Sequence, residues 1–238
     1  MKIIFFGDSL TEGTPGASYF TILKEKLPED SLVNAGRGGD TVISLYRRVK
    51  KMNMSKTFDI AILWVGVNDV LVHVSKKYPI IKLCCIQPWA KNIKDFDKHY
   101  RKLLEIVAGK ARKTFTVSPL LIGENTDNKW NEKLGKLCTE IERLSAEYEH
   151  VEYIDLRKVF FSTLSSRKPS PFILNSIFRD VIGAWLLNYP KIVEWRSLER
   201  GLYLTFDGVH FNHAGAEMAA DTFYRYITRE KDLKDVVT

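Results

Sequence analysis

Five short apolar segments, separated by segments of helical period, form the main pattern of this sequence. The apolar segments are rich in β-branched and aromatic residues and alternate little with polar ones, which is typical of parallel strands buried on both faces. They are Lys2–Phe6, Leu32–Ala35, Phe58–Val65, Thr114–Leu121 and Val151–Leu156. We therefore predict five parallel strands.

The segments between and after the strands repeat apolar residues every three or four positions, as amphipathic helices do. The predicted helices are Tyr19–Leu27, Thr41–Met52, Phe96–Arg112, Trp130–Glu149 and Ala214–Arg229. Asn212 is a plausible N-cap for the last of them. Alternating strands and helices predict a three-layer α/β/α sandwich with right-handed crossovers, whose ligand site lies at the carboxyl ends of the strands.

Two segments depart from this alternation. Leu71–Lys91 follows the third strand and is predicted to be a long loop, and Ser162–Tyr203 precedes the last helix. The second segment carries the aromatic residues Phe172, Phe178, Trp185, Tyr189 and Trp195. Long excursions are often lids or binding loops, so we expect residues 162–203 to form a cap beside the pocket. A dimer surface or an extension of the core remains open as an alternative.

The composition indicates a globular protein, with 45% hydrophobic and 27% charged residues in 238. We expect one domain over residues 1–238. The net charge of +7 arises from scattered residues, and the densest cluster is Arg47, Arg48, Lys50 and Lys51. Since this cluster ends a predicted helix, where cations are favoured, we predict a solvated helix end and no nucleic-acid partner.

The sequence contains neither an apolar run long enough to span a membrane nor the apolar core of a signal peptide. We therefore expect a cytoplasmic protein without stable membrane insertion. The three cysteines, Cys84, Cys85 and Cys138, are interpreted as reduced core thiols. Because no Cys/His pairs have zinc spacing, no metal site is expected.

A serine follows the first strand directly, in the segment Gly7–Gly13. By itself Ser9 could be a helix cap, but a serine becomes a nucleophile when a base removes its proton. The best candidate base is His210, and Asp207, three residues earlier, can hold its other ring nitrogen. The other histidines are predicted to be surface or packing residues: His73, His99, His150 and His213.

Two segments can supply hydrogen-bond donors to an oxyanion. Asn34–Thr41 is a glycine-rich turn whose backbone N–H groups we expect to be free, and Asn68 follows the third strand. The turn lacks the third glycine of the dinucleotide fingerprint, but a phosphate-binding nest remains an alternative. Asp8 and Asp69 are interpreted mostly as acceptors that stabilise turns.

These segments, in this order, resemble the SGNH hydrolases, also called GDSL esterases/lipases. The four residues that give the family its name match Ser9, Gly39, Asn68 and His210. The first block is GDSL followed by Glu12-Gly13, and the last is D-x-x-H from Asp207 to His210. Between them, N-x-G-x-x-G-x-T is matched at Asn34, Gly36, Gly39 and Thr41, and G-x-N-D at Gly66, Asn68 and Asp69.

The resemblance implies a flavodoxin-like sandwich with a five-stranded parallel sheet. It implies Ser9 as nucleophile, His210 as general base and acid, and Asp207 as the residue that orients the histidine. It also implies an oxyanion hole made of the Ser9 and Gly39 N–H groups and the Asn68 amide, without a metal or cofactor.

We therefore expect a serine esterase that cleaves a small soluble ester or an acetylated carbohydrate. One alternative is a lysophospholipase or thioesterase that acts on lipid acyl groups, and another is an acyltransferase that uses an alcohol acceptor. A third alternative is a non-catalytic module that binds phosphate or a nucleotide. The sequence leaves the oligomeric state and the acyl chain length open.

Overall fold

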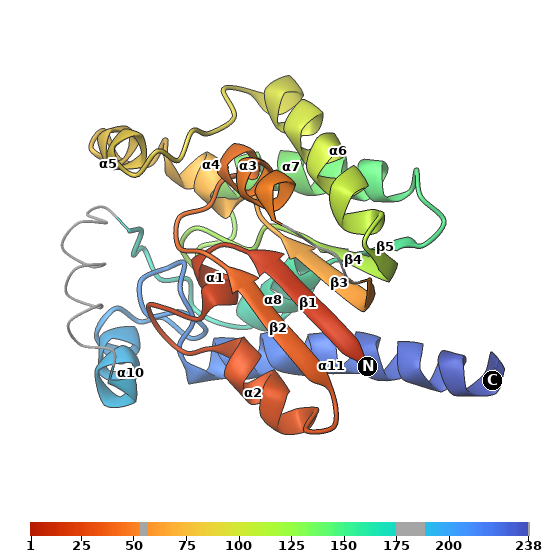
Figure 1. Cartoon of the computed structure of the whole chain (residues 1–238). Coiled ribbons are helices and arrows are strands. Elements are labelled where there is room, and N and C mark those ends of the chain that lie inside the picture. Colours follow the sequence, from red (N-terminus) through yellow and green to blue (C-terminus); the bar gives the residue numbers. More distant parts are fainter. Residues whose placement is uncertain (53–56, 175–188, 238) are drawn as a thin grey trace.

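A five-stranded parallel sheet with helices on both faces forms the centre of the molecule (Figure 1). The computed structural model describes residues 1–52, 57–174 and 189–237. The strands lie in the order β2-β1-β3-β4-β5, which is the flavodoxin-like order. The predicted α/β/α architecture is thus confirmed.

All five predicted strands are present. Their bounds are β1 Lys2–Gly7, β2 Ser31–Gly36, β3 Phe58–Trp64, β4 Ala111–Val117 and β5 Val151–Ile154. The helices are α1 Ser9–Glu12, α2 Tyr19–Lys26, α3 Val42–Lys51, α4 Val67–Leu71, α5 Tyr78–Cys84, α6 Ile93–Ala108, α7 Lys129–Ser145, α8 Leu156–Ser165, α10 Pro190–Glu199 and α11 His213–Val237.

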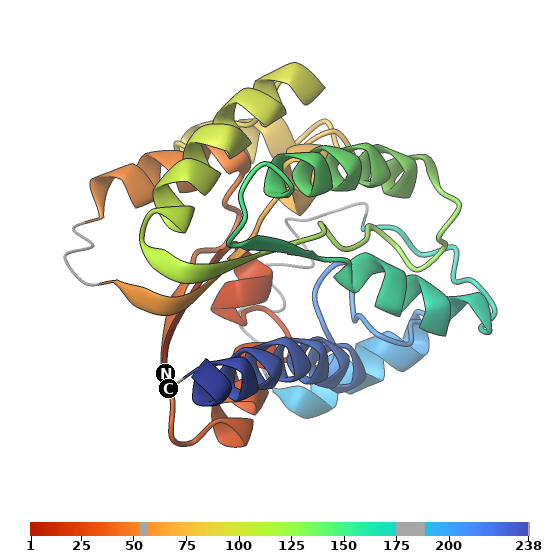
Figure 2. The same cartoon turned by 90° about the vertical axis from the view of Figure 1, so that its right-hand side faces the viewer.

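Two separate hydrophobic cores lie on the two faces of the sheet, which Figure 2 shows between its two layers of helices. Helices α3, α6 and α7 cover one face, and α2, α8 and α11 cover the other. Side chains of β1 alternate between the cores: Ile4 and Phe6 pack on the first face, Ile3 and Phe5 on the second. The expected burial on both faces is therefore confirmed for β1. It is wrong for the edge strand β2, where Val33 is 37% exposed.

The boundary between α6 and β4 differs from the prediction. The predicted helix continued to Arg112, whereas α6 ends at Ala108 and the chain enters β4 at Ala111. Ala111 pairs with Phe58 and Lys113 pairs with Ile60 on β3. Pairing with the neighbouring strand outweighs a helical pattern that is weak at these polar positions.

The basic cluster at the end of α3 is only in part a solvated helix end. Arg47, Lys50 and Lys51 are exposed, but Arg48 is half-buried. Its Nη2 donates to the carbonyl of Ala35 at 2.8 Å and to that of Gly7 at 3.3 Å, and its Nε donates to Asp40 at 2.9 Å. Arg48 therefore ties together the ends of β1 and β2, a role that the charge pattern did not indicate.

The ends of β1, β2 and β3 meet at one edge of the sheet. Gly7 lies in register with Gly36 on β2 and with Trp64 on β3. The chain passes from β1 outward to β2 and then returns across β1 to β3. In open α/β sheets, ligands bind where the strand order reverses in this way. The candidate segments after all three strands are thus brought to the same place.

The two excursions also contain helices. Within Leu71–Lys91, the predicted loop contains α5, which projects away from the sheet at the upper left of Figure 1. Within residues 162–203, α10 carries the exposed Trp195. Tyr189, which directly precedes this helix, is also exposed. Phe178 and Trp185 lie outside the described residues.

Candidate active site

Ser9 stands at the first position of α1, immediately after β1. The carboxylate of Asp8 caps this short helix by accepting the N–H of Leu10 at 3.0 Å. Ser9 is 8% exposed. The first N–H groups of a helix have no acceptor within it, so the Ser9 N–H is available to a ligand.

Ser9, His210 and Asp207 form a continuous chain of hydrogen bonds. Ser9 Oγ lies 2.9 Å from His210 Nε2, and His210 Nδ1 lies 2.7 Å from Asp207 Oδ2. The other carboxylate oxygen of Asp207 accepts the N–H groups of Val209 at 2.9 Å and His210 at 2.7 Å. The serine and histidine are 201 positions apart in the sequence, and the fold brings them together as expected.

The electrostatics of this pair favour the charged form of both partners. Burial by itself raises the pKa of Asp207, but the adjacent His210 and the hydrogen bonds outweigh burial, so that the pKa lies below its ordinary value. Burial by itself lowers the pKa of His210. The charge of Asp207 and its hydrogen bond outweigh this too, and the pKa of His210 is raised above 6.5.

A buried glutamate holds the segment that leads to His210. Glu124 is fully buried and has no place in the predicted site. Its Oε1 accepts the N–H groups of Leu204 and Thr205, both at 2.8 Å, and its Oε2 accepts that of Tyr203 at 2.7 Å. These bonds fix the backbone just before Asp207, and with it the position of the histidine.

The glycine-rich turn after β2 offers fewer free N–H groups than expected. The N–H of Gly36 donates to Asn34, that of Arg37 to the Gly7 carbonyl, and that of Asp40 to the Arg37 carbonyl. The Gly38 N–H donates to Glu12 at 2.8 Å. Among the described residues, none accepts the N–H of Gly39. The negative charge of the Glu12 carboxylate, which lies against Gly38, also opposes the binding of an anion. This weakens the alternative of a phosphate-binding nest.

Gly39 adopts φ +75°, a conformation that favours glycine. A Cβ at this position would come within 2.7 Å of Gln87 Oε1 and 2.9 Å of Lys82 Nζ. The glycine therefore serves two needs, the left-handed backbone and the close approach of these two side chains.

The side-chain amide of Asn68 faces the same region from the first turn of α4. One of its N–H groups donates to Asp8 Oδ2 at 3.0 Å, and its oxygen accepts the hydroxyl of Tyr78 at 2.7 Å and the ammonium of Lys82 at 3.3 Å. Since Nδ2 carries two hydrogens, one is left for a ligand.

Asp8 and Asp69 are buried acceptors. The interpretation as acceptors that stabilise turns is confirmed for Asp8, which accepts the N–H of Leu10, and is wrong for Asp69, whose donors lie in distant segments. Asp69 accepts the N–H groups of Val42 at 2.9 Å and Ala90 at 3.0 Å. Burial raises the pKa of Asp8 to about 6 and that of Asp69 to about 7. Through its hydrogen bonds to Val42 and Ala90, Asp69 ties α3 and the end of the Leu71–Lys91 segment to α4.

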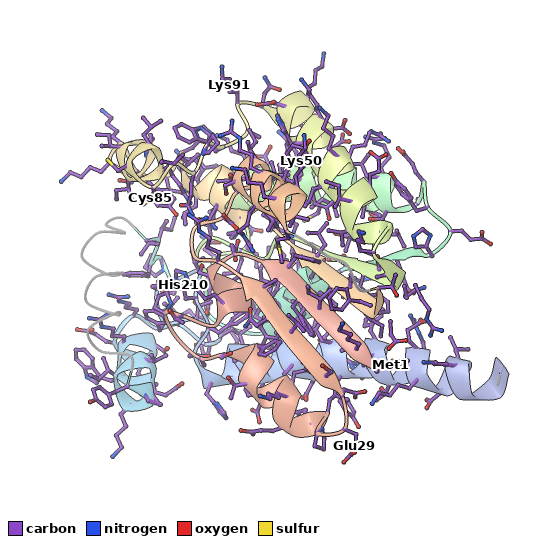
Figure 3. The ribbon with its side chains drawn as sticks, viewed as in Figure 1. Met1, Glu29, Lys50, Cys85, Lys91 and His210 are labelled. Atoms are coloured by element: carbon purple, nitrogen blue, oxygen red, sulfur yellow. The ribbon has the colours of Figure 1, made fainter. Side chains whose placement is uncertain are left out.

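A pocket of about 340 Å³ opens above Ser9. Ser9, Gly39, Asn68 and His210 all line it, and His210 lies at the end of the molecule from which α5 projects (Figure 3). The Leu71–Lys91 segment contributes Leu71, Tyr78, Ile81, Lys82, Cys85 and Gln87 to its walls. Of the described part of residues 162–203, Leu174 lines the pocket.

Sequence reasoning missed Tyr78, Lys82 and Gln87, which contact the glycine turn or Asn68. A signal was present, because Tyr78, Ile81, Lys82 and Cys85 have the spacing of one helix face. The interpretation of the cysteines as core thiols is wrong for Cys84 and Cys85, which are exposed. They belong to a helix that projects from the core, so the apolar stretch around them did not indicate burial.

None of the remaining histidines, which all belong to the described residues, shares a hydrogen bond with Ser9, His210 or Asp207. His99 Nδ1 donates to the Asp95 carbonyl at 2.8 Å, and His150 Nε2 donates to the Ala108 carbonyl at 3.3 Å. His73 and His213 are exposed. In the described part of the chain, no group of three or more His, Cys, Asp or Glu residues could hold a metal ion. The helices within those residues include none that is long and apolar enough to cross a membrane.

Solved structures share this fold. An acetyl xylan esterase named AlAXEase is 24% identical, with 95% of this chain and 100% of that chain covered and a TM-score of 0.66. An acetylxylan esterase from Geobacillus stearothermophilus is 18% identical, with 94% and 92% covered and a TM-score of 0.65. An α/β hydrolase from the metagenome of Lake Arreo, Spain, is 19% identical, with 93% and 92% covered and a TM-score of 0.63.

Variants of the Geobacillus enzyme have also been solved as catalytic mutants, in which a serine, an aspartate or a histidine is replaced by alanine. In that enzyme the aspartate precedes the histidine by three positions. A comparison with curated proteins found no match.

A family model matches most of the sequence. The model describes the GDSL-like Lipase/Acylhydrolase family, and the match covers residues 5–218. This range includes the segments after β1, β2 and β3 and the segment before α11. The resemblance found in the sequence is therefore confirmed: the chain belongs to the GDSL-like Lipase/Acylhydrolase family and is an ester-cleaving serine hydrolase.

Proposed function

We propose that this protein removes acetyl groups from acetylated carbohydrates through an acyl-enzyme on Ser9. The observation that carries the proposal is the hydrogen-bonded chain from Ser9 through His210 to Asp207, at 2.9 and 2.7 Å, which opens on a small pocket. The Geobacillus catalytic mutants support it, because they change the same three residue types with the same spacing of aspartate and histidine.

The reaction follows from the geometry. Ser9 Oγ attacks the ester carbonyl carbon while His210 Nε2 takes the hydroxyl proton, and Asp207 stabilises the imidazolium that forms. The oxyanion is held by the N–H groups of Ser9 and Gly39 and the free N–H of Asn68. His210 then gives its proton to the leaving alcohol, the C–O bond breaks, and a water activated by His210 releases the acid.

The size of the pocket favours a short acyl group. Its volume of about 340 Å³ is near the lower end of the range for small-molecule sites. Leu71, Ile81 and Val209 provide an apolar wall for the acyl methyl group. The carbohydrate part of the proposal rests on the acetylxylan esterases that share the fold.

The test compares wild-type protein on p-nitrophenyl esters from acetate to palmitate and on acetylated xylo-oligosaccharides, with released acetate measured for the latter. We expect kcat/KM to be highest for acetate, because each methylene that does not fit a pocket costs about 10-fold or more. We also expect acetate release from the oligosaccharides.

Other outcomes would support the alternatives. A maximum at octanoate or longer chains would indicate a lipid acylhydrolase. A new ester, formed at the expense of free acetate when an alcohol acceptor is added, would indicate an acyltransferase. Turnover of none of these esters would contradict the proposed substrate class.

The pH profile should show an acidic limb above pH 6.5. His210 acts as a base only when it is neutral, so activity is lost as pH falls through its pKa. Because Asp207 raises that pKa above the ordinary value of 6.5, the limb is expected above 6.5 in a plot of kcat/KM against pH, which reports the free enzyme. Full activity down to pH ~4 would exclude His210 as the base.

A further inference from the structure

A buried lysine in the wall of the pocket has no part in the reaction described above. Lys82 belongs to α5 and is 1% exposed. Lysines are almost never fully buried unless they are paired, because removing an ammonium from water is costly. Its surroundings must therefore compensate for burial, and its hydrogen-bond acceptors lie in the glycine turn, on Asn68 and on Gln87.

Three oxygen atoms accept hydrogen bonds from the ammonium group of Lys82. They are the Gly39 carbonyl, Asn68 Oδ1 at 3.3 Å and Gln87 Oε1 at 3.4 Å. The ammonium also lies 4.9 Å from the centre of the Tyr78 ring. Two of its three acceptors thus belong to residues that we assign to the oxyanion hole.

We propose that Lys82 is a positioning residue that, together with Gln87, builds the oxyanion hole from the Leu71–Lys91 segment and places a positive charge behind it. This inference rests on the proposed function, since it assigns Lys82 to the same reaction. It gives α5 a role in the rate of the reaction as well as in the wall of the pocket.

Lys82 helps to determine which way the Asn68 amide faces, together with Asp8 and with the Tyr78 hydroxyl, which donates to Asn68 Oδ1 at 2.7 Å. An ammonium has donors only, so the amide oxygen must face Lys82. On the other side lies the Asp8 carboxylate, which is an acceptor and receives an N–H of Asn68 at 3.0 Å. Between a donor and an acceptor the amide has one favourable orientation, and it directs the second N–H of Asn68 to the pocket.

Both peptide groups that flank Gly39 are also held by this segment. Gln87 Nε2 donates to the Gly38 carbonyl at 2.8 Å, which belongs to the same peptide group as the free Gly39 N–H. Hydrogen bonds polarise one another, so a bond to the carbonyl strengthens the N–H as a donor. Lys82 in turn holds the Gly39 carbonyl and Gln87 Oε1, which fixes the next peptide group.

The charge of Lys82 depends on pH. The titratable groups that face it are Asp69 on α4, Asp8 before α1, Asp40 before α3, and Cys85 after α5, besides the Tyr78 ring. Burial lowers the pKa of Lys82 to about 8, although the three carboxylates oppose this shift. Above that pH the ammonium becomes neutral and the positive charge behind the oxyanion is lost. We therefore expect kcat to fall on the alkaline side, near pH 8.

The experiment compares Lys82→Met with Lys77→Met, an exposed lysine next to the same helix. Removing a direct donor to an oxyanion costs about 10²–10³ in kcat, and loss of a positioning residue should cost less, about 10- to 100-fold. KM should stay close to the wild-type value. The affinity for an alkyl boronic acid, which forms a tetrahedral anionic adduct on serine, should fall with kcat. Lys77→Met should match wild type in all three measurements.

The conservative variant Lys82→Arg separates charge from packing. Arginine keeps the positive charge but does not titrate in this range, so Lys82→Arg should recover part of kcat and lose the alkaline limb. Gln87→Ala, which keeps Lys82, should lower kcat and retain the alkaline limb. Cys85→Ser should also retain it, which excludes the thiol as its cause.

The inference is overturned if Lys82→Met retains the kcat and boronate affinity of Lys77→Met, or if wild type shows no alkaline limb near pH 8. If Lys82→Met does not fold, the wild-type pH profile and the Lys82→Arg variant still test the inference. Failure of the proposed function can be distinguished from failure of this inference alone. It would appear as the absence of Ser9-dependent ester turnover in wild type, and it would overturn both the proposed function and the role of Lys82.

Discussion

Replacing Ser9 with alanine is expected to lower kcat for p-nitrophenyl acetate by about 10⁴- to 10⁶-fold. In the proposed mechanism, the variant lacks the oxygen that attacks the carbonyl, and His210 then has no hydroxyl proton to take. The rate that remains comes from the donors of Gly39 and Asn68 and from water activated by His210. Steady-state kinetics on wild type and variant measure the effect directly.

A matched control is Ser166→Ala, which removes an exposed hydroxyl that donates to the Thr163 carbonyl at 3.1 Å, after the end of α8. It should keep wild-type kcat and KM. A fluorophosphonate should label wild type on the peptide that contains Ser9 and should not label Ser9→Ala. Substantial turnover by Ser9→Ala, or a label on another serine, would place the nucleophile elsewhere.

The fold could be predicted because strand and helix patterns alternate in a way that few architectures accommodate. Parallel strands end at the same edge, so residues that directly follow β1, β2 and β3 must meet there, and the register of Gly7 with Gly36 and Trp64 brings them together. Ser9, Gly39 and Asn68 could therefore be assigned to one site from their positions after strands.

The support around these residues could not be predicted in the same way. Lys82 and Gln87 lie in a segment whose pattern gave no strand or long helix, and a lysine among apolar residues is ordinarily exposed. Its burial depends on the Gly39 carbonyl and Asn68 Oδ1, which are distant in sequence. Likewise, the turn after β2 was expected to have several free N–H groups, and Glu12 and Asn34 use two of them.

Replacing Asp207 with asparagine is expected to lower kcat by about 10⁴-fold, although the change removes no atom that touches the substrate. In wild type, Asp207 Oδ1 accepts two backbone N–H groups while Oδ2 accepts the proton on His210 Nδ1. If the asparagine oxygen keeps both backbone bonds, its NH₂ group must face Nδ1. The imidazole then carries its proton on Nε2, where it cannot take the proton of Ser9.

The pH profile distinguishes this mechanism from a general loss of structure. Since the charge of Asp207 raises the pKa of His210, its removal should move the acidic limb of the residual activity to lower pH. The control is Asp155→Asn, because Asp155 caps α8 through the Lys158 N–H at 3.0 Å and asparagine caps a helix equally well. It should leave both rate and limb unchanged. An Asp207→Asn variant with near wild-type kcat would show that Asp207 does not control the tautomer of His210, whereas a low rate with the limb unmoved would show that its charge does not set the pKa of the base.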